Sequence, residues 1–131
     1  MKLSEARLVV EAAKRRTDEL GVPMSIAVVD GSGHLVALER MDGAGFITSD
    51  LALGKAWTAA AFGAPTGALA DRFANALPFS VAVTAATNGR FTPRQGALPV
   101  PGGGGAGASG GAPDQDEEVV RAGLEALASS G

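Results

Sequence analysis

The chain contains no cysteine and no tyrosine, and it has one histidine and one tryptophan among its 131 residues. Without cysteine, disulfide bonds, thiolate zinc sites and cysteine nucleophiles are excluded. A single histidine also excludes any metal site that needs two histidine ligands from one subunit. The available chemistry is therefore that of carboxylates, lysine, arginine and one imidazole.

Basic clusters and long apolar runs are missing as well. The chain has 11 Lys and Arg against 14 Asp and Glu, which gives a formal net charge of −3, and a surface that neutralises nucleic-acid phosphates needs several basic side chains together. No apolar run is long enough to span a bilayer, and the start MKLSEARLVV lacks the apolar core of an export signal. We therefore expect a soluble cytoplasmic protein that binds neither nucleic acid nor membrane.

The hydrophobic periodicity predicts helices and strands in alternation. It predicts a helix over 6–20, a β-hairpin over 26–40 that turns at 30–33, helices over 50–62 and 69–74, a strand over 79–86 and a C-terminal helix from Pro113. This order favours an α+β fold in which helices flank a central antiparallel sheet. We find no repeat or linker, so residues 1–131 are interpreted as one domain.

The stretch 96–111 is dominated by glycine and alanine. These residues are poor strand formers, so a strand here would depend on its neighbours, and the pattern leaves open whether one forms. The glycine run 102–105 lacks the Lys-Ser/Thr that follows in a phosphate-binding loop. We interpret the run as a short flexible turn.

Several segments together match one family in order. They are AVVDGSGHLVALERMDGA, LGKAWTAAAFGAPT, NGRF, GALP and SGGAPDQDEEVVRAG. This set resembles the GlcG/HbpS-like family, also called the haem-degrading domain family, which is related to the C-terminal domain of PduO-type proteins. The resemblance implies a profilin-like fold, a symmetric homo-oligomer and binding of haem or a related tetrapyrrole. It also implies that the family's recurrent polar positions fall on Arg40, Asp42, Lys55 and Asp116.

One departure from the family pattern concerns the second strand of the hairpin after GALP. The resemblance implies branched apolar residues where this chain has Gly103, Ala106 and Ala108. Small residues in a core either thin it or leave room for a ligand, because a missing branched side chain leaves a cavity. We therefore expect Ala106 and Ala108 to line a ligand pocket.

His34 is the leading side-chain ligand if haem is bound, since no cysteine or tyrosine competes with it. Apart from that role we predict no metal site. The alternative is that His34 is a half-exposed residue that follows the hairpin turn.

Arg40 and Asp42 flank Met41 at the exit of the hairpin. Arginine can clamp a carboxylate with its planar fork, and Asp42 can act as a base. A loop-stabilising ion pair, or an Asx turn before Gly43, explains the same residues without a ligand.

Lys55 interrupts an apolar helix, and Asp116 belongs to the acidic start of the last helix. A desolvated lysine can act as a base, a nucleophile or an anion contact, whereas a lysine that snorkels packs its stem and keeps its ammonium in water. We expect Arg40, Asp42, Lys55 and Asp116 to line one cavity. Trp57 is interpreted as a core or subunit-interface anchor.

We therefore predict a small-molecule-binding protein, with haem as a possible cofactor. Two alternatives remain open. One is a cofactor-independent enzyme in which Lys55, Asp42 and Asp116 transfer protons and Arg40 orients an acidic substrate. The other is a purely structural assembly protein.

Overall fold

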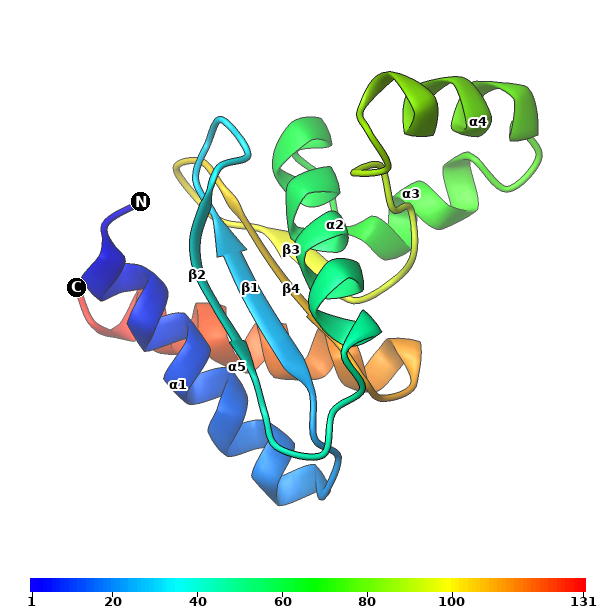
Figure 1. Cartoon of the computed structure of the whole chain (residues 1–131). Helices are drawn as coiled ribbons and strands as arrows, with labels where there is room; N and C mark the ends of the chain where they lie inside the picture. The colour runs from blue at the N-terminus through cyan, green and yellow to red at the C-terminus, as the bar shows by residue number, and fades with distance from the viewer.

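The computed structural model describes all residues, 1–131. Its elements follow in the order α1 (Leu3–Leu20), β1 (Ser25–Val29), β2 (Leu35–Arg40), α2 (Ile47–Phe62), α3 (Thr66–Arg72), α4 (Leu77–Ala86), β3 (Ala97–Pro99), β4 (Gly105–Ser109) and α5 (Pro113–Ser129) (Figure 1). None of these helices combines the length and the hydropathy that a bilayer crossing requires. The predicted α+β class, with helices flanking an antiparallel sheet, is confirmed.

The sheet has four strands in the order β2-β1-β4-β3. All three neighbouring pairs are antiparallel, and β4 lies between β1 and β3. The glycine-rich segment, which the composition left undecided, is therefore an interior strand. Its glycine and alanine side chains add little to strand stability, so the backbone hydrogen bonds to its two neighbours hold it in the sheet.

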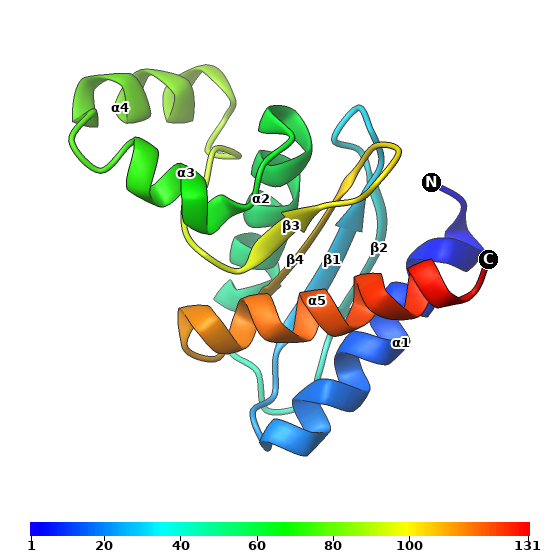
Figure 2. The ribbon, with the colours of Figure 1, turned by 180° about the vertical axis from the view of Figure 1, so that it is seen from behind.

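One face of the sheet is covered by α1 and α5, which cross it side by side (Figure 2). Branched apolar side chains fill this layer. The main core contains Ala6, Val9, Val10, Ala13, Met24, Ile26, Val28, Leu98, Val100, Ala106, Ala108, Val119 and Val120. Because side chains alternate along a strand, Ile26 and Val28 of β1 and Ala106 and Ala108 of β4 point into this core.

The opposite face is covered by α2 alone, and it is packed differently. Its buried apolar cluster has only four members, Ala27, Val29, Ala52 and Ala56, with partly buried Leu38, Leu53 and Ala60 packed against them. Gly105 and Gly107 of β4 lie under the helix, where a Cβ on Gly107 would come within 2.6 Å of the Ala52 carbonyl oxygen. Glycine is therefore required on this face because the α2 backbone rests directly on the strand.

The segment 79–86, predicted as a strand, is helical, so that prediction was wrong. Phe79, Val81 and Val83 alternate with small residues, but the segment lies in an arm formed by α3 and α4 that stands away from the sheet (Figure 1). No strand is available there as a partner, and a helix satisfies its own backbone hydrogen bonds. Pro78 in the first turn is compatible with a helix start.

Candidate functional site

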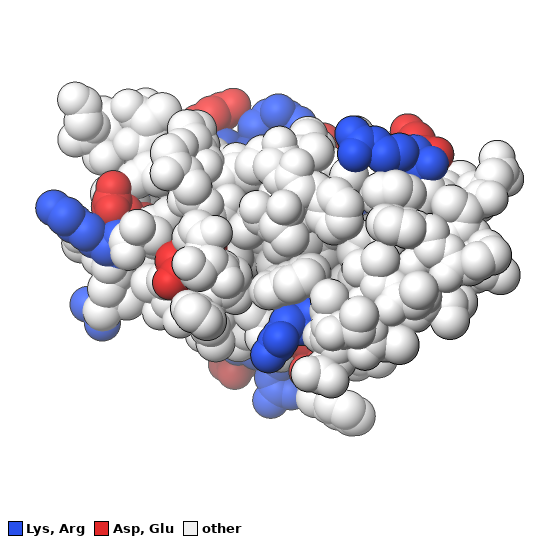
Figure 3. All heavy atoms as spheres, turned by 90° about the horizontal axis from the view of Figure 1, so that it is seen from above, with Lys and Arg blue, Asp and Glu red and all other residues white.

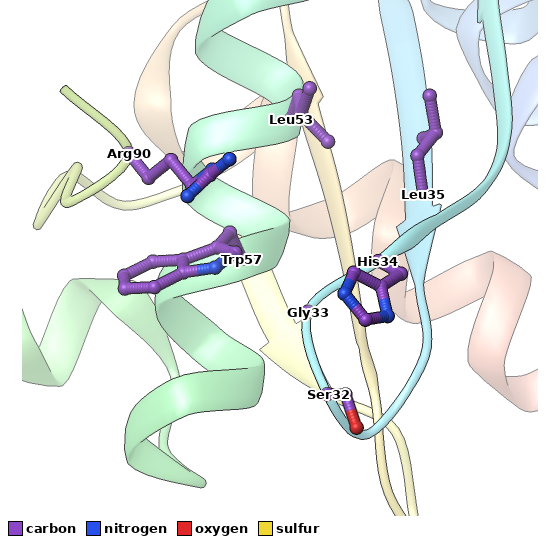
Figure 4. Close-up of a pocket in the computed structure, with 7 residues that line it drawn as sticks. All are labelled: Ser32, Gly33, His34, Leu35, Leu53, Trp57 and Arg90. Atoms are coloured by element: carbon purple, nitrogen blue, oxygen red, sulfur yellow. The ribbon is translucent and has the colours of Figure 1, made fainter. Parts of the chain in front are cut away.

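A surface hollow of about 260 Å³ lies between the β1–β2 hairpin and α2 (Figure 4). Its lining residues come from three separate segments: Ser32, Gly33, His34 and Leu35 from the hairpin, Leu53 and Trp57 from α2, and Arg90 from the loop after α4. The chain's only imidazole and its only indole therefore line the same hollow.

The hairpin turn holds His34 through its backbone and leaves its ring free. Asp30 accepts hydrogen bonds at Oδ1 from the backbone N–H groups of Ser32 and His34, both at 2.9 Å. These bonds, that from His34 above all, hold the pKa of the Asp30 carboxyl below its ordinary value. The His34 side chain is 81% exposed, and its Nδ1 lies 3.9 Å from Asp30 Oδ2. The carboxylate therefore faces Nδ1, and Nε2 is the ring nitrogen left for a ligand.

Gly33 brings the hairpin into contact with α2. Its φ is +83°, and a Cβ at this position would come within 2.7 Å of Cδ1 and Nε1 of Trp57. The edge of the indole thus packs against the glycine backbone. Only glycine combines this backbone conformation with the close approach, so the turn residue places His34 beside Trp57.

Arg90 reaches the hollow because its loop is fastened to α2 by Thr58. Thr58 Oγ1 donates to the Gly54 carbonyl within α2 at 2.7 Å and accepts a hydrogen bond of 2.8 Å from the N–H of Thr92, and the Arg90 carbonyl lies 3.4 Å away. The Arg90 side chain lies beside Trp57 in Figure 4. An exposed guanidinium at the edge of an aromatic and aliphatic wall is suited to the carboxylate of a largely apolar ligand.

Lys55 and Asp116 form an ion pair in the interior, away from this hollow. Lys55 Nζ donates to Asp116 Oδ2 and to the Ala108 carbonyl, both at 3.1 Å, and both side chains are only 4% exposed. Asp116 Oδ1 accepts a hydrogen bond of 2.9 Å from the Gly111 N–H. The pair ties α2 to β4 and to the start of α5. Lys55 is not a snorkelling lysine.

The environment of this pair disfavours charge on Asp116. Burial raises the pKa of its carboxyl above the ordinary value, and the charge and hydrogen bond of Lys55 offset this only in part. The Gly96 backbone packs against this pair, since a Cβ on Gly96 would come within 2.8 Å of Lys55 Nζ. The Lys55 ammonium is therefore enclosed by backbone and by one carboxylate.

The structure does not bring the four predicted polar residues together. Arg40 and Asp42 line an open hollow at the end of β2, together with Lys14, Asp18, Glu39 and Met41. Lys55 and Asp116 do not border it. Arg40 and Asp42 also form no ion pair, so the loop-stabilising pair considered for them is absent.

Ala106 and Ala108 are fully buried in the core under α1 and α5. The small residues of β4 allow a close approach on the opposite face, where the α2 backbone packs against Gly105 and Gly107. The ligand pocket that we expected beside Ala106 and Ala108 is therefore absent.

Of the residues that line the His34 hollow, only His34 was a sequence candidate for a site, and Trp57, expected to be a core or interface anchor, lines the hollow instead. Arg90 lies in the NGRF segment, but nothing in the local pattern connects it to His34, which is far away in the sequence. A group of three or more metal-ligating His, Asp or Glu side chains does not occur. The His34 hollow therefore offers one histidine with aromatic and cationic neighbours, and not a set of several metal ligands.

Comparison with known proteins identifies the family. The family described as haem degrading protein HbpS-like matches residues 1–125, so the chain belongs to the HbpS-like family. Among curated proteins, the chain is 31% identical over 138 residues to the corrinoid adenosyltransferase PduO of Citrobacter freundii and 32% identical over 127 residues to that of Salmonella typhimurium. The two alignments cover 97% and 88% of the chain but only 39% and 35% of those proteins.

Solved structures give the same result. A double mutant of HbpS from Streptomyces reticuli is 34% identical, with a TM-score of 0.82, and the match covers 95% of this chain and 85% of that one. A structure described as a PduOC:heme complex is 28% identical, with a TM-score of 0.84, and covers 96% of this chain and 94% of that one. The fold is therefore shared with HbpS and with the protein of the PduOC:heme complex.

Proposed function

We propose that this HbpS-like protein binds haem or a related tetrapyrrole in the hollow between the β1–β2 hairpin and α2, with His34 as the axial ligand. The observation that carries the proposal is that the exposed ring of His34, the chain's only histidine, borders the same hollow as Trp57 and Arg90. The family match and the haem complex of a relative support the choice of ligand.

The residues present fit the chemistry of haem. A haem ligand on the protein is most often an imidazole, and the Nε2 of His34 is turned away from the Asp30 carboxylate. Trp57, Leu53 and Leu35 offer aromatic and aliphatic contacts to a macrocycle, and the Arg90 guanidinium can bind a propionate. When bound, the group would supply an iron centre whose properties depend on this axial ligand and on the polarity around it.

The proposal includes assembly into a homo-oligomer. Typical ligand sites have volumes of about 300 to 1,000 Å³ and bury most of the ligand surface. The hollow of about 260 Å³ is smaller than that and is open to solvent. A ligand as large as haem therefore needs a cover beyond the residues of one chain. Adenosyl transfer is not part of the proposal, because the chain spans 39% of the length of the PduO of Citrobacter freundii.

Haem titration tests the proposal. Hemin is added to the wild type and to His34→Ala, while the Soret band and the fluorescence of Trp57, the only tryptophan, are followed. We expect saturable binding to the wild type, and an altered Soret band with affinity reduced about tenfold or more in His34→Ala, because the iron loses its protein ligand.

Two arginine variants provide the matched comparison. Arg90→Met should weaken binding by a few-fold, since it removes a propionate contact, whereas Arg94→Met, which changes an exposed arginine that does not line the hollow, should leave binding unchanged. Identical spectra and affinities for the wild type and His34→Ala would reject His34 as the ligand. Absence of saturable binding by the wild type would reject haem binding altogether.

A further inference from the structure

Asp30 and His34 are held to each other across the β1–β2 turn. The N–H of Asp30 donates to the His34 carbonyl, and the N–H of His34 donates to Asp30 Oδ1, both at 2.9 Å. Oδ1 also accepts the N–H of Ser32, so the carboxylate cannot rotate away without losing two hydrogen bonds. The turn therefore fixes the carboxylate beside the backbone of His34.

The second carboxylate oxygen of Asp30 has no other partner in the protein. Both hydrogen bonds to the carboxylate end on Oδ1, and no ion pair joins Asp30 to a lysine or an arginine. Figure 3 views the end of the molecule that carries this turn, and its Lys and Arg side chains are scattered rather than gathered in one patch. The one ionisable group within ion-pair distance of Oδ2 is the His34 ring.

We propose that Asp30 is a positioning residue that makes His34 a better ligand for ferric than for ferrous haem. This inference rests on the proposed function and deepens it. A carboxylate that faces Nδ1 favours the tautomer with its proton on Nδ1, which leaves the lone pair of Nε2 free for iron. The same negative charge makes the imidazole a stronger electron donor, and a stronger donor stabilises ferric iron more than ferrous iron.

The contact between the two side chains suits this role. Asp30 Oδ2 and His34 Nδ1 lie 3.9 Å apart, which is about 1 Å longer than a hydrogen bond. The His34 side chain is 81% exposed, so a small rotation of its ring, or one bridging water, closes the gap. Only the ring has to move, because the backbone N–H groups already hold the carboxylate.

Asp30→Asn tests the role with little change in shape. The asparagine carbonyl can keep the two backbone hydrogen bonds of the turn, while its amide NH₂ replaces the acceptor that faces Nδ1. Asp114→Asn is the matched control, because it removes the same charge from an exposed position of α5 that does not line the hollow. Far-UV circular dichroism establishes that each variant is folded.

The first measurement needs no haem. His34 is the only histidine, so the ¹⁵N signals of its ring are unambiguous in the ligand-free protein. They are recorded at about pH 8.5, above the range in which histidine ordinarily titrates. We expect the Nδ1–H tautomer to predominate in the wild type and in Asp114→Asn, and the Nε2–H tautomer in Asp30→Asn. The same tautomer in all three proteins would overturn the orienting role.

The second measurement is the reduction potential of bound haem, obtained by spectroelectrochemical titration. Asp30→Asn should weaken the binding of ferric haem about threefold to tenfold, and that of ferrous haem less. A threefold change in the ratio of the two affinities raises the one-electron potential by about 28 mV. Asp114→Asn should leave the potential unchanged. If Asp30 only maintained the turn, both oxidation states would be weakened alike and the potential would not move.

A double variant shows whether Asp30 acts through His34. In the His34→Ala background, Asp30→Asn should leave the affinity for hemin unchanged, because the ring on which Asp30 acts is missing. An equal loss of affinity in both backgrounds would overturn the proposal.

The outcomes separate this proposal from the proposed function. Haem binding with an unchanged tautomer and potential in Asp30→Asn would overturn the role of Asp30 and leave the haem site standing. If the wild type bound no hemin, the proposed function would fail and the effect on iron with it. The tautomer in the ligand-free protein would then decide alone whether Asp30 orients His34.

Discussion

The two faces of the sheet are built on different principles. Under α1 and α5, branched side chains such as Val9, Ile26 and Val119 interlock in a large apolar core. Under α2, the helix backbone rests on Gly105 and Gly107, and the cluster beside it is small. The α2 face also contains the buried Lys55–Asp116 pair and Thr58, while the His34 hollow lies at its margin.

Within one domain, the face under α1 and α5 is therefore built for stability, and the face under α2 carries the polar groups. A core of interlocking apolar side chains contributes free energy of unfolding through buried area. A face built from backbone contact contributes less buried area, but it sets the distance between helix and sheet narrowly. Polar groups carried by α2, such as Lys55, therefore receive well-defined partners. We expect substitutions on the two faces to differ in kind, and the following predictions test that expectation.

The largest effect is expected from Gly105→Ala. The added methyl would overlap the Ala56 carbonyl oxygen, so α2 must move away from β4. We expect a loss of about 4 kcal/mol or more in the free energy of unfolding, measured by urea denaturation, because a backbone contact cannot relax as a side chain can. Gly45→Ala, which has open space around it, should change the value by less than about 1 kcal/mol.

A deletion on the other face completes this comparison. Ile26→Val removes one methylene group from the core under α1 and α5, and such a change costs about 1 kcal/mol. Adding one carbon on the α2 face should thus be more damaging than removing one on the opposite face. Similar losses for Gly105→Ala and Ile26→Val would contradict the distinction between the faces.

The next effect in size is expected from Lys55→Met. The variant leaves the Asp116 carboxylate buried without its counter-charge, and breaking a buried pair costs about 3 to 5 kcal/mol. Since burial already raises the pKa of Asp116, this cost should shrink as the pH falls and the carboxyl becomes protonated. Denaturation curves from neutral to acidic pH measure the trend.

Two further variants identify the cause. Adding Asp116→Asn to Lys55→Met should recover most of the lost stability at neutral pH, because the unpaired charge is gone. Lys14→Met, which removes a lysine from the surface pairs with Glu11 and Glu39, should cost no more than about 1 kcal/mol. If Lys55→Met were as harmless as Lys14→Met at neutral pH, the pair would not hold α2 to β4.

The sequence predicted the parts of the fold whose patterns are local. The hairpin around 30–33 and the first and last helices follow from period and turn residues. The segment 79–86 misled because Phe79, Val81 and Val83 alternate as in a strand, while the helical outcome depends on the absence of a neighbouring strand in the arm. Whether a neighbouring strand is present depends on the tertiary fold, so a local sequence pattern cannot predict it.

The candidate site was predicted only in part for the same reason. His34 stood out as the single histidine, but its neighbours Leu53, Trp57 and Arg90 come from α2 and from the loop after α4. The alternation of Gly105, Ala106, Gly107 and Ala108 held a usable signal, since glycine on every second position indicates a close backbone approach to one face. The residues interpreted as room for a ligand, Ala106 and Ala108, instead face the core under α1 and α5, and α2 lies on the alternate positions Gly105 and Gly107.

The smallest effect is expected from Asp30→Asn at the hairpin turn, where neither face of the sheet is disturbed. Backbone hydrogen bonds from His34 and Ser32 lower the pKa of Asp30 below its ordinary value of about 3.9. A carboxyl with a lowered folded-state pKa adds stability above its unfolded-state pKa and loses it as the pH falls through the folded-state value. The wild type should therefore be slightly more stable than Asp30→Asn at neutral pH, and the difference should begin to shrink at about pH 4 and vanish only below the lowered folded-state pKa. Urea denaturation of both proteins between neutral pH and about pH 2.5 measures this, and a difference that persists at the acidic end would show that the carboxylate charge does not hold the turn that presents His34.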